Sequence, residues 1–213
     1  MIKYAFVKVG IPTTTIQRLG FFDKVSFDIG GDIYSFNDLE NGILRANSKA
    51  PFALSFPFSK EDSRVNYIVK DFDPRIHFAL NCGAKSCPPV KPYTVENIEK
   101  ELQSTTFDFT DNDENVFVDE EKNELKLTMI LNWFSSDFAP SKDQIPESIL
   151  PFLREGSTKK ETLQRMINEK SSIKVNFFEY DWSTNASQCQ QFDTKQLKSN
   201  YSSFRAILKK VVS

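Results

Sequence analysis

The sequence predicts a mixed α+β fold, a single domain in which short β-hairpins and helices pack together. Helical and strand-like segments are interleaved along the chain, and two pairs of strand-like segments are joined by tight turns. Hairpins pair strands antiparallel, whereas a doubly wound parallel sheet needs long crossover connections, so the α+β class is favoured. Hydrophobic residues make up 39% of the 213 residues, which is enough to bury a sizeable core.

The first half of the chain is predicted to contain a helix, a hairpin and a second helix. Residues 2–9 form the first helix, which a glycine ends. Residues 21–34 alternate on both sides of a Gly-Gly pair, which indicates a hairpin. Ser35 followed by Asp38 resembles a capping box and opens a helix over residues 36–44, whose apolar residues have helical spacing.

The second half is predicted to hold a short strand, a second hairpin and further helices. Residues 76–80 are expected to form a strand, with Ile76 and Phe78 on one face and His77 on the other. A helix is expected to start at Thr94. The remaining predicted elements are a hairpin over 116–129, an aromatic helix over 130–134, a helix over 158–170, a strand over 173–177, a linker over 183–191 and a helix over 201–212.

Charge and apolar content exclude several classes of partner. The 27 basic and 29 acidic residues are mixed along the chain and give a net charge of −2, so no nucleic-acid partner is predicted. No apolar run approaches the roughly 20 residues that a membrane span needs, and lysines interrupt the apolar start, so neither a membrane partner nor a signal peptide is expected. Three cysteines in a chain of this length indicate a reducing, cytoplasmic compartment.

Residues 73–89 are the chemical centre of the sequence. His77 is the only histidine in the chain, and Cys82 and Cys87 follow it closely. A thiol nucleophile needs a neighbouring base, which a His–Cys pair supplies. Cysteine is also among the residues most often buried as a small apolar side chain, so the same three residues are consistent with a structural role. Spacing alone favours the structural interpretation.

The same residues do not form a good metal site. Structural zinc takes four Cys or His ligands, and only His77, Cys82 and Cys87 cluster here, so we predict neither a metal nor a cofactor. A disulfide between the two cysteines is possible from their spacing, but a reducing compartment argues against a permanent one.

Three motifs resemble those of a known family, the domain of unknown function 547 family. The first is the run Asp-Pro-Arg-Ile-His-Phe-Ala-Leu at residues 73–80 with Cys82-Gly83 and Ser86-Cys87-Pro88-Pro89 after it; the second is Gly30-Gly31 with residues 34–45; the third is Tyr180-Asp181-Trp182. The resemblance covers residues 1–185 and leaves 186–213 as a linker and C-terminal helical tail. The family has no established biochemical activity, but its acidic helix, His and Cys are similar in kind to papain-like or transglutaminase-like thiol enzymes.

One position departs from the family pattern. Members usually carry a Tyr-Asn pair and then a histidine in the helix before the first hairpin. Tyr4 stands where the histidine is expected, and the Tyr-Asn pair would precede Met1. The resemblance therefore implies one of two things: the sequence lacks the family's usual N-terminal helix segment, or this member has lost part of the site.

The family motifs also nominate residues around the central segment. Glu40 could orient His77, or could be a surface acid in the first turns of a helix. Arg45 could pair with a carboxylate such as Asp73, or could be solvated. We take Arg45, Asp73 and Arg75 as candidate binding residues.

Two functions remain open. The favoured one is a binding or scaffold module with an unknown protein or small-molecule partner. The alternative is a thiol-dependent hydrolase or acyl transferase. In that enzyme Cys82 or Cys87 would attack a carbonyl, His77 would transfer the proton and Glu40 would orient the imidazole. Backbone N–H groups over residues 83–85 would hold the oxyanion.

Overall fold

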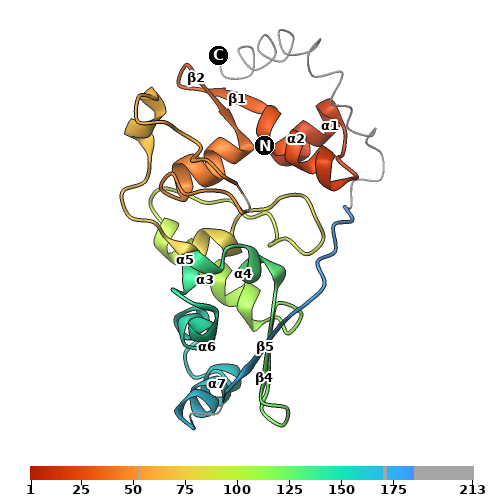
Figure 1. Ribbon diagram of the computed structural model, residues 1–213, viewed down its shortest axis with the longest axis vertical. Helices are drawn as coiled ribbons and strands as arrows, with labels where there is room; N and C mark the ends of the chain where they lie inside the picture. Colours follow the sequence, from red (N-terminus) through yellow and green to blue (C-terminus); the bar gives the residue numbers. More distant parts are fainter. Residues whose placement is uncertain (52, 170–171, 185–213) are drawn as a thin grey trace. The chain divides into compact units, whose positions relative to one another are not determined.

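The computed structural model describes residues 1–51, 53–169 and 172–184 (Figure 1). It divides into two compact units, one of residues 1–73 and one of residues 74–183. Helices and small sheets occur together, so the predicted α+β class is confirmed. The linker over 183–191 lies almost wholly outside the described residues, and the tail from 186 with its helix over 201–212 lies entirely outside them.

The first unit begins with two helices. Helix α1 (Ile2–Val9) is confirmed and ends at Gly10, whose φ of 95° suits glycine. Helix α2 (Thr15–Lys24) was not predicted, and it takes the first four residues of the hairpin expected over 21–34. A reciprocal capping box starts it, because the Thr14 hydroxyl accepts from the Gln17 N–H and the Gln17 side chain accepts from the Thr14 N–H.

A hairpin and an unusual helix follow in the first unit. Strands β1 (Ser26–Ile29) and β2 (Asp32–Ser35) pair antiparallel around the Gly-Gly turn, as predicted. The predicted capping box is also present, since the Ser35 N–H donates to Asp38 Oδ2 at 2.9 Å and the Asp38 N–H donates to Ser35 Oγ at 3.0 Å. It opens η1 (Asp38–Leu44), a π-helix whose last turn closes with the Arg45 N–H donating to the Glu40 carbonyl.

An apolar cluster and one arginine hold the first unit together. The cluster consists of the buried residues Ile2, Ala5, Phe6, Phe21, Val25 and Phe27. Arg64, in the short helix η2 (Ser63–Tyr67), forms ion pairs with Asp38 and Asp62 and donates to the Ile33 carbonyl at 2.7 Å. Its guanidinium lies 4.3 Å from the centre of the buried Phe58 ring. Arg64 therefore ties β2, η1 and the following loop together.

The second unit combines a three-stranded sheet with short helices. Strands β3 (Val116–Asp119) and β4 (Glu124–Leu127) form the predicted hairpin, and β5 (Lys174–Phe177) adds parallel to β4. The helices are η3 (Pro74–Phe78), α3 (Ile98–Asp111), α4 (Met129–Trp133), α5 (Ser135–Phe138), η4 (Lys142–Gln144), α6 (Ile145–Ile149), η5 (Leu150–Phe152) and α7 (Thr158–Asn168). Figure 1 shows α7 beside the sheet. The core contains Phe78, Phe109, Val116, Leu125, Leu127, Leu131 and Leu163.

Two predictions for this unit are wrong. Residues 74–78 form the 3₁₀-helix η3 in place of the strand expected over 76–80. Pro74 presets the backbone angle for a helical start, and Ile76, His77 and Phe78 are all buried, so the side chains do not alternate between two faces. Helix α3 begins at Ile98, four residues after the predicted start. Before it, the Thr94 N–H and hydroxyl bind the Glu101 carboxylate, so this segment folds back on the helix.

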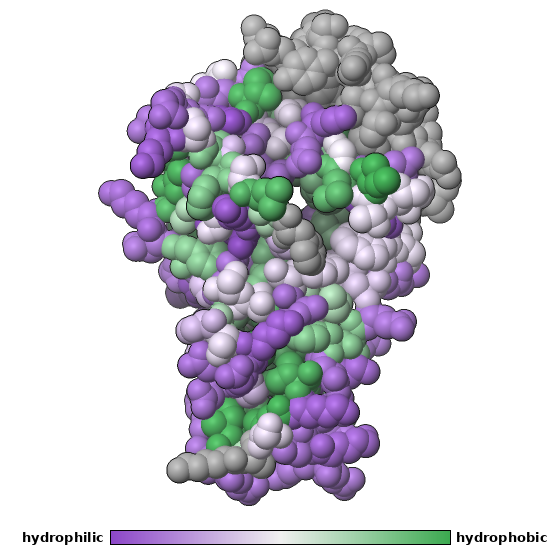
Figure 2. All heavy atoms as spheres, viewed as in Figure 1, coloured by the Kyte–Doolittle hydropathy of each residue, from purple (hydrophilic) through white to green (hydrophobic). Residues whose placement is uncertain are grey.

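The surface mixes polar and apolar residues. On the face shown in Figure 2, hydrophilic residues surround smaller hydrophobic areas. Ile16 on α2 and Leu54 in the loop between η1 and η2 are 81% and 95% exposed. Within the part of the chain that the structure describes, no helix has the length and apolar character needed to cross a bilayer.

Candidate functional site

His77 lies near the end of η3 and is held by a buried carboxylate. Its Nε2 lies 2.8 Å from Oδ2 of Asp137 on α5, and the two side chains are 2% and 9% exposed. The imidazole stacks on Phe134 with ring centres 4.2 Å apart. A carboxylate only accepts hydrogen bonds, so the proton of this contact belongs to Nε2, and Asp137 fixes the ring's orientation.

Cys82, five residues after His77, forms a disulfide with Cys87. Their Cα atoms are 6.3 Å apart, within the range that a disulfide spans. This is the pairing that we disfavoured from the reducing compartment, and it means that neither sulfur is a free thiol in this structure. The loop between them is shaped by Gly83, whose φ is 90°, and by Asn81, whose side chain accepts from the Gly83 N–H at 2.8 Å.

The disulfide contacts a cluster of large aromatic residues. The Tyr180 hydroxyl lies 3.3 Å from Cys82 Sγ and 3.0 Å from Cys87 Sγ. The Tyr180 ring centre is 4.8 Å from that of Trp133 and 4.6 Å from that of Trp182. All five side chains are partly exposed. We call Trp133, Tyr180 and Trp182 the aromatic trio.

The segment around the trio is also joined to the disulfide loop through its backbone. The Lys85 N–H donates to the Ser183 carbonyl at 2.8 Å, and the Ser86 N–H donates to the Asp181 carbonyl at 3.3 Å. The Asp181 N–H in turn donates to the Ser86 hydroxyl at 2.8 Å. Residues 180–183 therefore lie along the disulfide loop, next to both sulfurs. We call these four residues the strip.

The other predicted site residues have structural partners. Arg45 is 3% exposed, and its guanidinium donates to the Asn41 side chain and, at 2.8 Å, to the Lys49 carbonyl. Glu40 belongs to the same π-helix and is half-buried. Both residues lie in the first unit, whereas His77 belongs to the second, so the predicted orientation of His77 by Glu40 stays a prediction.

Arg75, in the second unit, binds α3. Its Nη2 lies 2.6 Å from Glu99 Oε2, and its side chain is 17% exposed. The neighbouring half-buried Asp73 ends the first unit, and its predicted pairing with Arg45 stays a prediction. For Arg75 the geometry indicates a contact that joins η3 to α3.

Four residues of the site were not predicted. Asp137 is 60 positions from its partner His77, and Trp133 lies on a helix that we predicted without assigning it a role. Tyr180 and Trp182 belong to a family motif but were not nominated for the site. The available signal was the density of aromatic residues around Asp137, which local periodicity cannot connect to His77.

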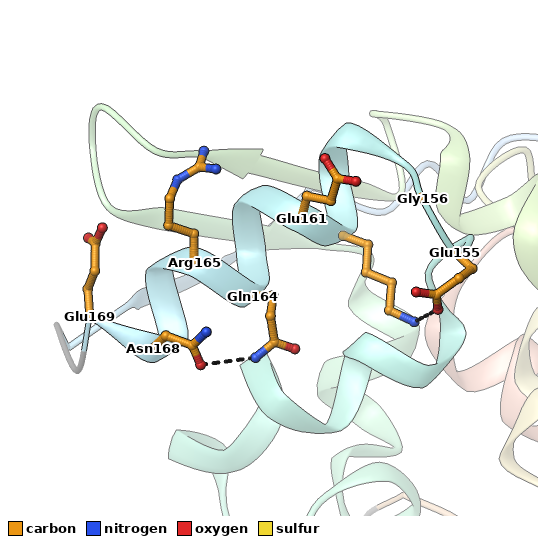
Figure 3. A pocket seen from close by; sticks show the side chains of 8 residues that line it. Glu155, Gly156, Glu161, Gln164, Arg165, Asn168 and Glu169 are labelled. Carbon is orange, nitrogen blue, oxygen red and sulfur yellow. Dashed lines mark hydrogen bonds and ion pairs between the residues drawn. The ribbon is translucent and has the colours of Figure 1, made fainter.

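A surface hollow of about 510 Å³ lies elsewhere, along α7 (Figure 3). Its walls are polar and charged, and their side chains bind one another: Lys160 pairs with Glu155 at 2.6 Å and Gln164 donates to Asn168 at 3.2 Å. None of the predicted site residues lines it. Among the described residues there is also no group of three or more His, Cys, Asp or Glu side chains arranged to hold a metal.

Comparison with known proteins identifies the family. A family model described as "Protein of unknown function, DUF547" matches residues 1–110. The chain belongs to the DUF547 family. The match includes His77, Cys82 and Cys87 of this DUF547 chain, whereas Asp137 and the aromatic trio lie beyond it. Neither the curated proteins nor the solved structures give a match, and the suggested papain-like or transglutaminase-like fold is not confirmed.

Proposed function

We propose that this DUF547 chain is a non-catalytic binding module whose aromatic trio, beside the disulfide loop, holds a protein partner. The disulfide carries the proposal. Both cysteines nominated as nucleophiles are bonded to each other, and a disulfide sulfur has no thiolate with which to attack a carbonyl. The imidazole that would activate a thiol is buried against Asp137. These features argue against acyl transfer at the central segment.

The chemistry of the surrounding surface suggests how a partner would bind. Tryptophan and tyrosine are enriched at the energetic centres of protein interfaces because they bury a large area with few rotatable bonds. The trio is half-buried and braced by its own ring contacts, so its rings are already ordered before binding.

Acidic groups lie beside the trio. Asp181 is 53% exposed and lies 3.9 Å from the Lys85 ammonium. Hydrogen bonds from Ser183 hold the pKa of its carboxyl below the ordinary value, so it is ionised at neutral pH. Glu179 next to the trio is also exposed. We therefore expect a partner that offers an apolar anchor flanked by basic residues.

The test compares two aromatic substitutions on the full chain. After a partner is isolated by cross-linking, its dissociation constant is measured against the unsubstituted chain, Trp182→Ala and Phe117→Ala. Phe117, on β3, is 39% exposed and lies outside the trio, so it is the matched control. Loss of a central aromatic should weaken binding by about 2 kcal/mol, roughly thirtyfold. Equal affinities for the two variants would refute the proposal.

The second candidate function is the thiol-dependent hydrolase or acyl transferase. One observation favours it: the Asp137 carboxylate orients His77, which is the third-group arrangement of nucleophile–base sites. Such an enzyme would be active only after the disulfide is reduced. Iodoacetamide labelling of the reduced chain decides: one fast cysteine that becomes slow in His77→Gln would support the enzyme, and uniformly slow labelling would support the binding module.

The cytoplasmic location predicted from the cysteine count belongs with this proposal. In a reducing compartment a disulfide of this kind is usually transient and redox-sensitive. A cytoplasmic chain would therefore present the trio next to a bond that is made and broken.

A further inference from the structure

We infer that the Cys82–Cys87 disulfide is a thiol–disulfide exchange site, which small thiols of the glutathione class reduce reversibly. Cys82 is the sulfur that the incoming thiol attacks, and Cys87 is the sulfur that leaves. This inference concerns the chemistry of the bond itself. It stands whether or not the aromatic trio binds a partner.

The two sulfurs differ in the hydrogen bonds that they receive. Cys87 Sγ accepts from the Cys82 N–H at 3.0 Å and lies 3.0 Å from the Tyr180 hydroxyl. Cys82 Sγ lies 3.3 Å from that hydroxyl. Disulfide sulfurs carry no hydrogen, so the hydroxyl is the donor in both contacts. Negative charge that develops when the bond breaks is therefore better stabilised on Cys87.

The position of the bond also suits exchange better than stabilisation. The two cysteines are only five residues apart in the sequence, so the bond closes a short loop and restricts the unfolded chain much less than a long-range disulfide does. Both residues are partly exposed, so a small thiol can approach the loop.

The exchange balances with two molecules of thiol. The thiolate of the first attacks Cys82 Sγ, the Cys82–Cys87 bond breaks, and its electron pair leaves on Cys87 Sγ, which then takes up a proton. The thiolate of the second molecule attacks the first thiol's sulfur in the mixed disulfide and releases Cys82, which is protonated in turn. The two small thiols lose two electrons and become one small disulfide, while the protein gains two thiols. Tyr180 is a positioning residue that donates to the departing sulfur.

Reduction has a structural consequence at the neighbouring strip. Residues 180–183 are held by the Lys85 and Ser86 N–H groups and by Tyr180 at the sulfurs. When the short ring of the disulfide opens, the loop loses the restraint that presents these two N–H groups to the strip. Amide hydrogen exchange at Lys85 and Ser86 should therefore accelerate on reduction, whereas exchange in α3 should not change.

The experiment measures how fast excess glutathione reduces the disulfide in the folded full chain. The chain carries Cys189→Ser, so Cys82 and Cys87 are its two cysteines. Acid quenching, alkylation and mass spectrometry then locate the trapped mixed disulfide. We expect glutathione on Cys82 and the alkyl group on Cys87. Tyr180→Phe, which keeps the ring, should slow reduction about tenfold, because a hydrogen bond to a charged sulfur is lost. Tyr93→Phe is the matched control, since its hydroxyl donates to Thr105 and not to sulfur.

Three results would overturn the inference. They are glutathione found mainly on Cys87, a disulfide that resists glutathione until denaturant is added, and equal reduction rates in Tyr180→Phe and Tyr93→Phe. If Tyr180→Phe does not fold, the position of glutathione in the chain with the native tyrosine still decides. A chain that exchanges as expected but binds no partner would contradict only the proposed binding function.

Discussion

The buried pair of His77 and Asp137 gives the sharpest stability prediction. Removal of the carboxylate in Asp137→Ala leaves the Nε2–H of a side chain that is 2% exposed without its acceptor. Nε2 donates to the Asp137 carboxylate over 2.8 Å, and a hydrogen bond to a charged group contributes about 1.5–3 kcal/mol to stability. A buried donor that loses its acceptor adds a desolvation cost of about 1–3 kcal/mol. We therefore expect Asp137→Ala to lower the free energy of unfolding by about 3–4 kcal/mol.

A graded series separates charge from shape. Asp137→Asn keeps an oxygen that accepts from Nε2–H and removes only the charge, so it should cost about 1–2 kcal/mol. Asp143→Ala removes an exposed acid from the neighbouring η4 and should change stability by less than about 0.5 kcal/mol. Urea unfolding followed by circular dichroism measures all three. The reasoning would be refuted if Asp137→Ala cost no more than Asp143→Ala.

A double-mutant cycle tests whether the cost belongs to the pair. His77→Phe keeps a ring to stack on Phe134 but removes the Nε2–H that donates to the buried Asp137 carboxylate. Adding Asp137→Ala to His77→Phe removes the carboxylate that has lost this donor. The double variant should therefore be more stable than the sum of the single effects predicts, by about 2 kcal/mol.

Three further predictions concern the first unit. Arg64→Ala removes two ion pairs and a ring contact from a side chain that is 20% exposed, so amide exchange over residues 26–45 should report a loss of about 3 kcal/mol. The hydrogen bonds from Arg64 lower the pKa of the Asp62 carboxyl. The stability that Asp62 contributes is therefore complete above the unfolded pKa of about 3.9 and is lost as the pH falls through the lower folded pKa. When stability is measured against pH, Asp62→Asn should lack this acid loss. In Gly42→Ala the new Cβ would overlap the buried Phe58 ring, and we expect a cost of about 1–3 kcal/mol in urea unfolding, whereas no cost would show that the ring moves freely.

Local sequence signals predicted those elements that local chemistry determines. The Gly-Gly pair at residues 30–31 requires positive φ at both positions, and the hairpin forms there. The Ser35–Asp38 capping box needs only three residues of separation, and both of its hydrogen bonds are present. The same reasoning failed at residues 76–80, because a short apolar run has no period long enough to distinguish a strand from a helical turn.

The site itself depends on contacts that no local pattern encodes. Its cysteines and histidine were identified because their residue types are rare and close together in the chain. Tyr180 lies 98 positions from Cys82, and Asp137 lies 60 positions from His77. Glu40 was nominated to orient His77 because it lies within a family motif, and that contact stays a prediction. Asp137 could not be found in this way, because a local pattern does not show which carboxylate the fold brings to Nε2.

His77 and the disulfide, the two parts of the central segment, are both linked to the end of α4. Trp133 and Phe134 are neighbours at the end of α4: the first packs on Tyr180 beside the disulfide, and the second stacks on His77. The buried contact between His77 and Asp137 holds the Phe134 side, because the 2%-exposed imidazole would give up this hydrogen bond if it moved. The cysteines on the other side are partly exposed. If the disulfide exchanges as we propose, reduction should loosen the disulfide loop and residues 180–183 while α4 stays in place.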